Sequence, residues 1–227
     1  MSYIDPFLFG IYPYIALTVF FVGSLLRFDR DQYSWKSDSS QLLRSGQLRW
    51  GSNLFHIGIL GILGGHFFGL LTPLSVFHLL GVTPAAKQLL AIAAGGSAGM
   101  SCLIGLLLLL HRRLTDARIR ATSRPADIFV LLLLLAQLLL GLFSITASLN
   151  HLDGGEMLML MSWAQHLATF RFDAPEFLTE VAPIFKVHIV LGMTIFLVFP
   201  FTRLVHIWSG FGAVGYVVRA YQLVRSR

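Results

Sequence analysis

Five long stretches without a charged residue constrain this chain more than any other feature of its sequence. They cover residues 6–26, 50–86, 88–110, 128–149 and 187–202. The hydrocarbon core of a bilayer is roughly 30 Å thick, and a helix needs about 20 apolar residues to cross it. The first four stretches reach that length, and the fifth reaches it by continuing to Trp208, with Arg203 extending toward the membrane surface.

These stretches predict an all-α integral membrane protein with five transmembrane helices. The expected spans are about 6–26, 51–72, 87–111, 127–149 and 183–208, and the Thr72-Pro73 pair ends the second. A charged fraction of 12% and a mean hydropathy of +0.73 exclude an ordinary soluble domain. The first span has no basic residue before it and no small-residue cleavage site, so we expect it to stay in the mature protein.

The basic residues predict how the chain is oriented in the membrane. Three segments hold fourteen of the seventeen Lys and Arg residues: Arg27, Arg30, Lys36, Arg44 and Arg49; Arg112, Arg113, Arg118, Arg120 and Arg124; and Arg203, Arg219, Arg225 and Arg227. Loops rich in Lys and Arg remain in the cytoplasm. We therefore expect the N-terminus outside and the C-terminus in the cytoplasm, and no nucleic-acid partner despite the net charge of +6. The two inner segments, residues 27–49 and 112–127, are explained equally well as orientation signals and as a docking surface for a cytoplasmic partner.

Four histidines lie within the predicted spans, His56 and His66 in the second and His188 and His206 in the fifth. Ionisable side chains at membrane depth are costly and usually functional. Neutral imidazole is a common axial ligand of haem iron, and two histidines per iron favour electron transfer over oxygen binding. The pattern therefore predicts two haem groups, with a proton relay or interhelical hydrogen bonds as the alternatives.

The spacing of these histidines predicts their pairing. His188 and His206 are eighteen residues apart, which in one helix means five turns, one shared face and about 27 Å of rise. His56 and His66 are ten apart, or about 15 Å. Since the two spans run in opposite directions, we expect His66 with His188 near the outside and His56 with His206 near the cytoplasm. The mismatch of about 12 Å requires helix tilt, a bend near Pro200 and oblique planes of the bound groups.

The glycines of the second span and the single cysteine bear less directly on a bound haem. Five glycines thin the second span beside its histidines, which favours either a flat macrocycle or close helix packing: Gly58, Gly61, Gly64, Gly65 and Gly69. The single cysteine, Cys102, excludes a disulfide framework and covalent haem attachment.

The residues outside the spans predict a surface location. The four remaining histidines are expected to be solvated or interfacial: His78, His111, His151 and His166. In the outer segment 150–186, residues 157–170 predict an amphipathic surface helix with Trp163 at headgroup depth.

The second and fifth spans carry longer motifs. SNLFHIGILGILGGHFFGLLTP and FKVHIVLGMTIFLVFPFTRLVHIWS closely resemble the gamma subunit of respiratory nitrate reductase, a dihaem cytochrome b subunit. The similarity continues through IYPYI, LRFDRDQYSW, RIRATS, WAQHLATF and YQLVRSR and so covers most of the chain. The sequence departs from the family in the loop 74–86, which is about one residue longer, and in the glycine-rich, apolar tail 210–218.

This resemblance implies that residues 1–227 form a single transmembrane cytochrome b domain in the bacterial inner membrane. Such a chain oxidises ubiquinol or menaquinol near the outer face, with protons released outside. It passes electrons inward through two haem b groups to an iron–sulfur beta subunit and a molybdenum alpha subunit that reduces nitrate. This chain itself contains no ligand set for molybdenum or an iron–sulfur cluster.

The resemblance also assigns residues. His66 and His188 match the ligands of the outer haem iron, and His56 and His206 match those of the inner one. Lys87 and Gly65 match positions at the quinol site beside His66. An ammonium at Lys87 is able to donate to a quinone oxygen, although simple extension to the membrane surface explains it equally well. Two inner arginines are candidates for binding haem propionates: Arg112 and Arg203.

Two other functions remain open from the sequence. An equivalent cytochrome b subunit of a heterodisulfide- or sulfite-reducing complex would carry the same haem spans. A haem-free transporter or anchor would instead use the buried histidines as a proton relay.

Overall fold

The structure is a computed structural model and describes residues 4–31, 45–150 and 152–209. Those residues form helices and no strand. Five helices are long and apolar enough to cross a membrane: Ile4–Arg30, Ser45–Leu71, Pro84–Thr115, Pro125–Leu149 and Pro183–Phe201. The predicted all-α fold with five candidate transmembrane helices is therefore confirmed.

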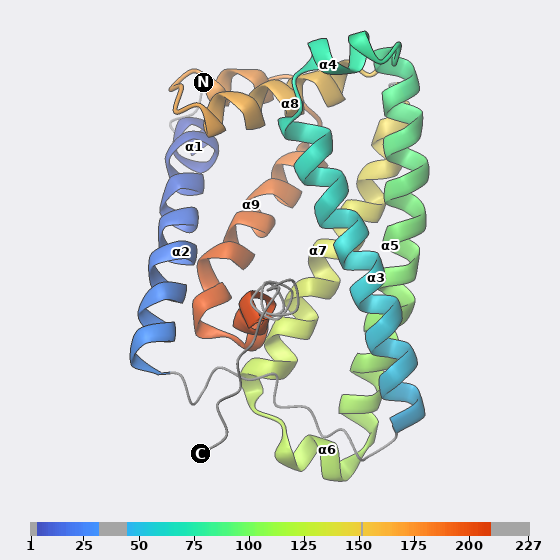
Figure 1. Ribbon diagram of the computed structural model, residues 1–227, viewed down its shortest axis with the longest axis vertical. Helices are drawn as coiled ribbons and strands as arrows, with labels where there is room; N and C mark the ends of the chain where they lie inside the picture. Colours follow the sequence, from blue (N-terminus) through green and yellow to red (C-terminus); the bar gives the residue numbers. More distant parts are fainter. Residues whose placement is uncertain (1–3, 32–44, 151, 210–227) are drawn as a thin grey trace, which may run out of the picture.

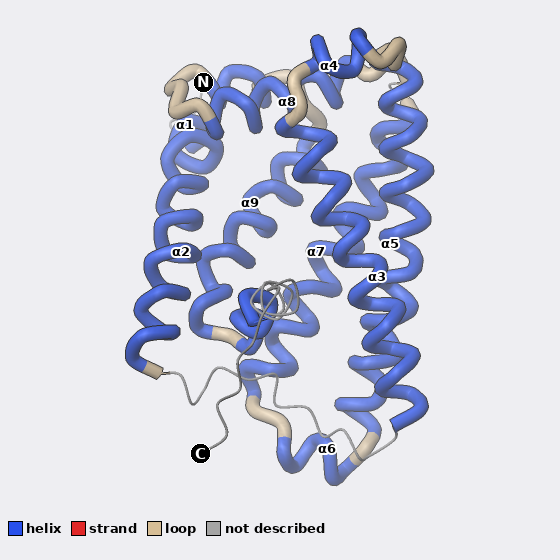
Figure 2. The backbone as a smooth tube through the Cα atoms, viewed as in Figure 1, coloured by secondary structure: helices blue, strands red, loops and turns tan. Residues whose placement is uncertain are grey.

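The five long helices stand roughly side by side, and shorter helices close both ends of the bundle (Figure 1). The first span consists of α1 (Ile4–Pro6), a π-helical turn (Phe7–Ile11) and α2 (Tyr12–Arg30). It is followed by α3 (Ser45–Leu71), α4 (Leu74–Leu79), α5 (Pro84–Thr115), α6 (Ala117–Thr122), α7 (Pro125–Leu149), α8 (Gly155–Ala168) and α9 (Pro183–Val198). The tube in Figure 2 shows α4 and α8 lying across one end and α6 across the other.

Local sequence explains where these helices begin and end. Pro73 follows α3 and cannot continue it, as the sequence predicted. The Thr83 hydroxyl accepts a hydrogen bond from the Ala86 amide and caps α5, whose first residue is proline. The Asp116 carboxylate accepts from two amides at the start of α6 and so turns the chain between α5 and α7.

Glycines bring α3 and α5 into close contact. A Cβ atom added at Gly58 would overlap the backbone of Cys102, and one at Gly105 would overlap the backbone of Phe55. At Gly61 it would lie 3.2 Å from the Ala98 Cβ. Helix packing therefore explains the first two glycines of the second span. The other three have no atom of the described chain within 4 Å of such a Cβ and leave an open face: Gly64, Gly65 and Gly69.

The fifth span is not one continuous helix, contrary to the assumption behind the predicted spacing of His188 and His206. Helix α9 ends at Val198 and gives way to 3-10 turns at Phe199–Phe201 and Arg203–Val205, separated by an extended Thr202 (φ −120°, ψ 175°). Pro200 explains this interruption, because proline has no N–H to donate and its ring clashes with the preceding helical turn. Residues 199–205 therefore do not continue the regular helical rise on which the mismatch of about 12 Å was based, and the chain turns aside at the lower end of α9 (Figure 1).

The outer segment also differs from its prediction in one respect. A helix forms close to the expected place, as α8, but Trp163 is buried within the protein instead of lying on its surface. Its indole N–H donates to the Phe9 carbonyl at 3.0 Å, and it belongs to a cluster that includes Leu178 and Phe185. Helix α8 therefore packs on the end of the bundle, because its apolar face has the first span and the start of α9 as partners.

Several expectations concern residues outside the described ranges. They are Lys36, Arg44, His151, the tail 210–218, and Arg219, Arg225 and Arg227.

Candidate functional site

Two histidine pairs bridge α3 and the fifth span at different depths. The rings of His66 and His188 have their centres 6.1 Å apart with planes at 34°. The rings of His56 and His206 have their centres 6.3 Å apart with planes at 73°. The structure thus brings together the same two pairs that the opposite directions of the spans predicted.

The spacing within each pair suits two ligands of one metal. A metal–imidazole bond is about 2 Å, which puts the centres of two rings on opposite sides of the metal about 6 Å apart. In the part of the chain that the structure describes, no three His, Cys, Asp or Glu side chains gather into an all-protein metal site. Each pair therefore fits an iron whose remaining ligands come from a macrocycle, as in haem.

Three of the four rings are oriented by a backbone carbonyl. The Nδ1 atoms of His56, His66 and His206 lie 2.7, 2.8 and 2.6 Å from carbonyl oxygens. The accepting residues are Ser52, Ile62 and Arg203, respectively. A ring that donates its Nδ1–H in this way keeps the lone pair on Nε2 for a metal.

His188 is held differently, by a residue that the sequence did not indicate. The Gln137 amide nitrogen donates to the His188 carbonyl at 3.2 Å and lies 3.2 Å from the ring Nε2. The ring Nδ1 is buried without a hydrogen-bond partner in the described chain. Gly141 makes room for the ring, because a Cβ there would lie 3.1 Å from the His188 Cε1. The Gln137 amide thus lies at the nitrogen that the other three rings keep for a metal, so His188 would bind a metal through Nε2 only once this contact is released.

Lys87 lies beside the outer pair and does not extend to the membrane surface. Lys87 is only 5% exposed, so the alternative that its side chain extends to the membrane surface is wrong. Its Nζ donates to the Gly69 carbonyl at 2.7 Å, contacts the Met161 Sδ at 2.6 Å and lies 4.4 Å from the centre of the Phe77 ring. Lys87 thus meets α3 one turn past His66, at Gly69.

The remaining quinol-site candidate, Gly65, precedes His66 directly on α3. A Cβ at Gly65 would have no described atom within 4 Å, so the helix surface beside the outer pair is open there. The open surface continues to Gly64 and Gly69 on the same helix. This is the part of α3 that a flat ligand can approach closely.

The two arginine candidates lie at the inner end of the bundle. Arg112 is 2% exposed in the last turn of α5. The Arg203 guanidinium lies 3.6 Å from the Asp127 carboxylate, which also accepts a hydrogen bond from Arg113 at 3.0 Å. Nothing in the sequence indicated that Asp127 pairs with these arginines, since a charged residue at the end of a span is usually solvated.

The other described histidines have surface partners or are exposed. His166 donates to Asp173 at 2.8 Å, and this hydrogen bond lowers the pKa of the Asp173 carboxyl below its ordinary value. His111 and the Gln47 amide lie 3.1 Å apart at the inner end. His78 is on the short helix α4. None of these three joins either histidine pair in the described structure.

Comparison with known proteins identifies the family. The sequence profile described as "Nitrate reductase gamma subunit" matches residues 5–227. The chain is 52% identical to the respiratory nitrate reductase 1 gamma chain of Escherichia coli (strain K12) over the full length of both. It is 41% identical to the nitrate reductase gamma chain of Bacillus subtilis (strain 168), covering 97% of each. It is also 31% identical to the Hdr-like menaquinol oxidoreductase cytochrome b-like subunit of Archaeoglobus fulgidus, covering 85% of this chain and 55% of that one. The chain therefore belongs to the nitrate reductase gamma subunit family, and the resemblance stated from the motifs is confirmed.

Proposed function

We propose that this chain is the quinol-oxidising dihaem cytochrome b subunit of a respiratory nitrate reductase. The observation that carries the proposal is the pair of facing histidine couples, at 6.1 and 6.3 Å, at two depths of one membrane bundle. In this proposal His66 and His188 hold the outer haem b, and His56 and His206 hold the inner one. A haem iron with two histidine ligands accepts and releases one electron at a time.

The residues around the outer pair suit a quinol. An ammonium has three N–H donors, and the contacts of Lys87 with Gly69 and Met161 use two of them. In this proposal the third donates to a quinol oxygen, while Gly65 leaves the adjoining surface of α3 open. Lys87, Gly65 and His66 would thus bind and orient ubiquinol or menaquinol at the end of the bundle that α4 and α8 cover.

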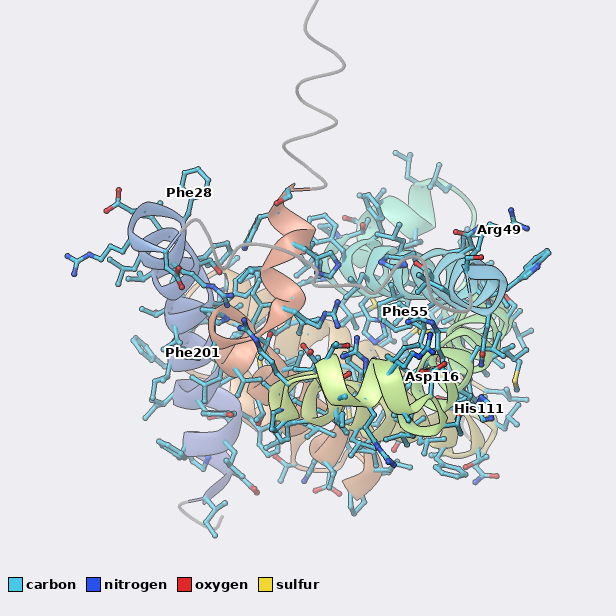
Figure 3. The ribbon with its side chains drawn as sticks, turned by 90° about the horizontal axis from the view of Figure 1, so that it is seen from below. Phe28, Arg49, Phe55, His111, Asp116 and Phe201 are labelled. Carbon is cyan, nitrogen blue, oxygen red and sulfur yellow. The ribbon has the colours of Figure 1, made fainter. Side chains whose placement is uncertain are left out.

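The charge distribution supports the direction of transfer. Arginines concentrate at the end of the bundle that α6 covers, which Figure 3 shows from below with Arg49 labelled on α3. Positive ends stay in the cytoplasm, so the N-terminus and the quinol site lie outside. Electrons then move inward and quinol protons leave outward. Each charge moved across the membrane stores about 2.3 kcal/mol per 100 mV of potential.

The partners follow from the family. Gamma chains by name belong to multi-subunit nitrate reductases. We propose a cytoplasmic iron–sulfur beta subunit as the electron acceptor and a molybdenum alpha subunit as the site of nitrate reduction. We also propose that Arg112 and Arg203, at the inner end, bind haem propionates. The complex would lie in the bacterial inner membrane.

A difference spectrum tests this function. Dithionite-reduced minus oxidised spectra with a pyridine haemochrome count should give two b-type haems per wild-type chain and about one in His66→Ala. The same variant should lose quinol oxidation, because the haem nearest the quinol is gone. A wild-type chain without haem, or a His66→Ala variant that still oxidises quinol at the normal rate, would contradict the proposal.

A second function is favoured by one comparison. The similarity to the Archaeoglobus fulgidus subunit, a menaquinol oxidoreductase component by name, covers most of this chain. A cytochrome b subunit of a heterodisulfide- or sulfite-reducing complex would use the same histidine pairs with other soluble partners. Identification of the proteins that co-purify with the tagged chain distinguishes the two. The haem-free transporter or anchor is distinguished by the spectrum itself.

A further inference from the structure

The interruption after α9 exposes backbone carbonyls inside a membrane bundle, where each needs a hydrogen-bond partner. Two of these carbonyls, at Pro200 and Thr202, accept hydrogen bonds from the same nitrogen of Arg27 at 2.7 and 2.8 Å. Arg27 lies in the last turn of α2, far from this segment in sequence. Its guanidinium replaces the helical amides that the interruption removes.

A carboxylate on α7 holds the other side of the segment. Asp127, which is 8% exposed, lies 3.6 Å from the Arg203 guanidinium and 3.0 Å from that of Arg113. The Arg203 carbonyl in turn accepts the Nδ1–H of His206 at 2.6 Å. An unbroken series of contacts therefore connects the Asp127 carboxylate with the imidazole that faces His56.

Packing fixes the same segment between α2 and α7. A Cβ at Gly23 of α2 would lie 2.9 Å from the Pro200 Cγ, so these two residues are in close contact. Val205 is fully buried against Val130 of α7 in a cluster with Phe199. Viewed from below in Figure 3, Phe28 on α2 and Phe201 in the interruption lie on the same side of the molecule.

His188 has none of these supports, because it lies within the regular part of α9. Its contacts come from Gln137 and Gly141 of α7. Arg27 and Asp127 therefore act on one end of the fifth span only. A defect in either one should affect the inner histidine pair selectively.

We propose that Arg27 and Asp127 are positioning residues that together fix the interrupted end of the fifth span so that His206 faces His56. This inference rests on the proposed function, in which that pair holds the inner haem. Arg27 acts by binding the carbonyls of residues 200 and 202 from α2. Asp127 acts through Arg203 from α7. Neither side chain touches the haem in this proposal.

The test compares Arg27→Gln and Asp127→Asn with two controls in the complete complex in membranes. Arg30→Gln removes an exposed positive charge one turn away, and Asp29→Asn removes an exposed negative charge on the same helix. Haem content per chain and the redox titration of the two b-type bands are measured, with His206→Ala as the reference for loss of the inner group.

We expect Arg27→Gln and Asp127→Asn to lose roughly half of the haem, with the spectrum and titration of the remaining group matching those left in His206→Ala. Arg27→Lys keeps the charge and one donor to a carbonyl, so it should recover part of the inner haem. Arg30→Gln and Asp29→Asn should retain both groups unchanged.

Two results would overturn the inference. The first is full retention of both haems with unaltered titration in Arg27→Gln and Asp127→Asn. The second is equal loss of both haems that Arg27→Lys does not relieve, which would make the residues general determinants of folding. Failure of the proposed function is distinct, because His206→Ala itself would then leave the haem content unchanged.

Discussion

The Lys87 ammonium donates to the Gly69 carbonyl at 2.7 Å, so a side chain from the start of α5 caps the last turn of α3. A cation at a helix C-terminus interacts favourably with the helix dipole and with carbonyls that have no amide partner. The Gln165 amide of α8 serves the same helix end by donating to the Leu70 and Thr72 carbonyls at 3.0 and 3.2 Å. Lys87 thus has a structural role beside the quinol-binding role that we propose for it.

Replacing Lys87 with Met should separate these roles. A hydrogen bond to a charged group contributes about 1.5–3 kcal/mol, so the loss of one to the quinol should lower kcat/KM for quinol by roughly 10- to 100-fold. The measurement is the rate of quinol-dependent haem reduction in membranes. Both haems should remain, since neither histidine pair contacts Lys87.

Gln165→Leu is the matched control for this variant. It removes the other side-chain cap of α3 without removing the proposed quinol contact. Its quinol oxidation should stay within about twofold of the wild type. A comparable loss of rate in both variants would show that Lys87 acts only by capping α3.

Gly141 determines whether the His188 ring fits beside α7. A Cβ at this position would already lie 3.1 Å from the ring, and a branched side chain adds more atoms in the same direction. Gly141→Val should therefore reduce the outer haem selectively and leave the inner one, as read from a haemochrome count and a redox titration. Gly96→Ala is the control, because its Cβ would make an ordinary contact of 3.6 Å with Ile145. An unchanged outer haem in Gly141→Val would contradict the assigned position of the His188 ring.

The sequence was sufficient to predict the spanning helices and to predict which histidines face each other. Charge-free length predicted five spanning helices, and the opposite directions of two spans paired His66 with His188 and His56 with His206. The exact path to His206 was not predictable in the same way. Pro200 indicates a bend, but its size depends on carbonyl partners supplied by a distant helix through Arg27.

The polar residues that contact the histidines or their neighbours could not be predicted from the sequence either. Gln137 reaches His188 across 51 residues of sequence, and Asp127 reaches Arg203 from a different span. Periodicity along one helix carries no information about such contacts. The burial of Trp163 was not predictable for a related reason: an amphipathic pattern shows that one face is apolar, but not whether lipid or protein covers it.

Gly58 is a position where a small change should strongly affect the stability of the bundle. A Cβ there would overlap the α5 backbone, which cannot move aside as a flexible side chain can. Overpacking of this kind typically costs about 1–3 kcal/mol. Gly58→Ala should therefore lower the thermal unfolding temperature of the purified chain in detergent. Gly95→Ala, where no described atom lies within 4 Å of the new Cβ, should leave it unchanged or raise it slightly, because alanine favours the helix more than glycine does.

The hydrogen bond between His166 and Asp173 should make the outer segment sensitive to acid. His166 lowers the pKa of the Asp173 carboxyl, which means that folding favours the carboxylate. The stabilisation is therefore present above the ordinary carboxyl pKa and is lost as the pH falls through the lowered one. Protease cleavage within residues 166–180 should accelerate as the pH is reduced through that acid range. Asp173→Asn should be cleaved faster at neutral pH with a weaker pH dependence, whereas an identical profile in the two proteins would show that another group controls this segment.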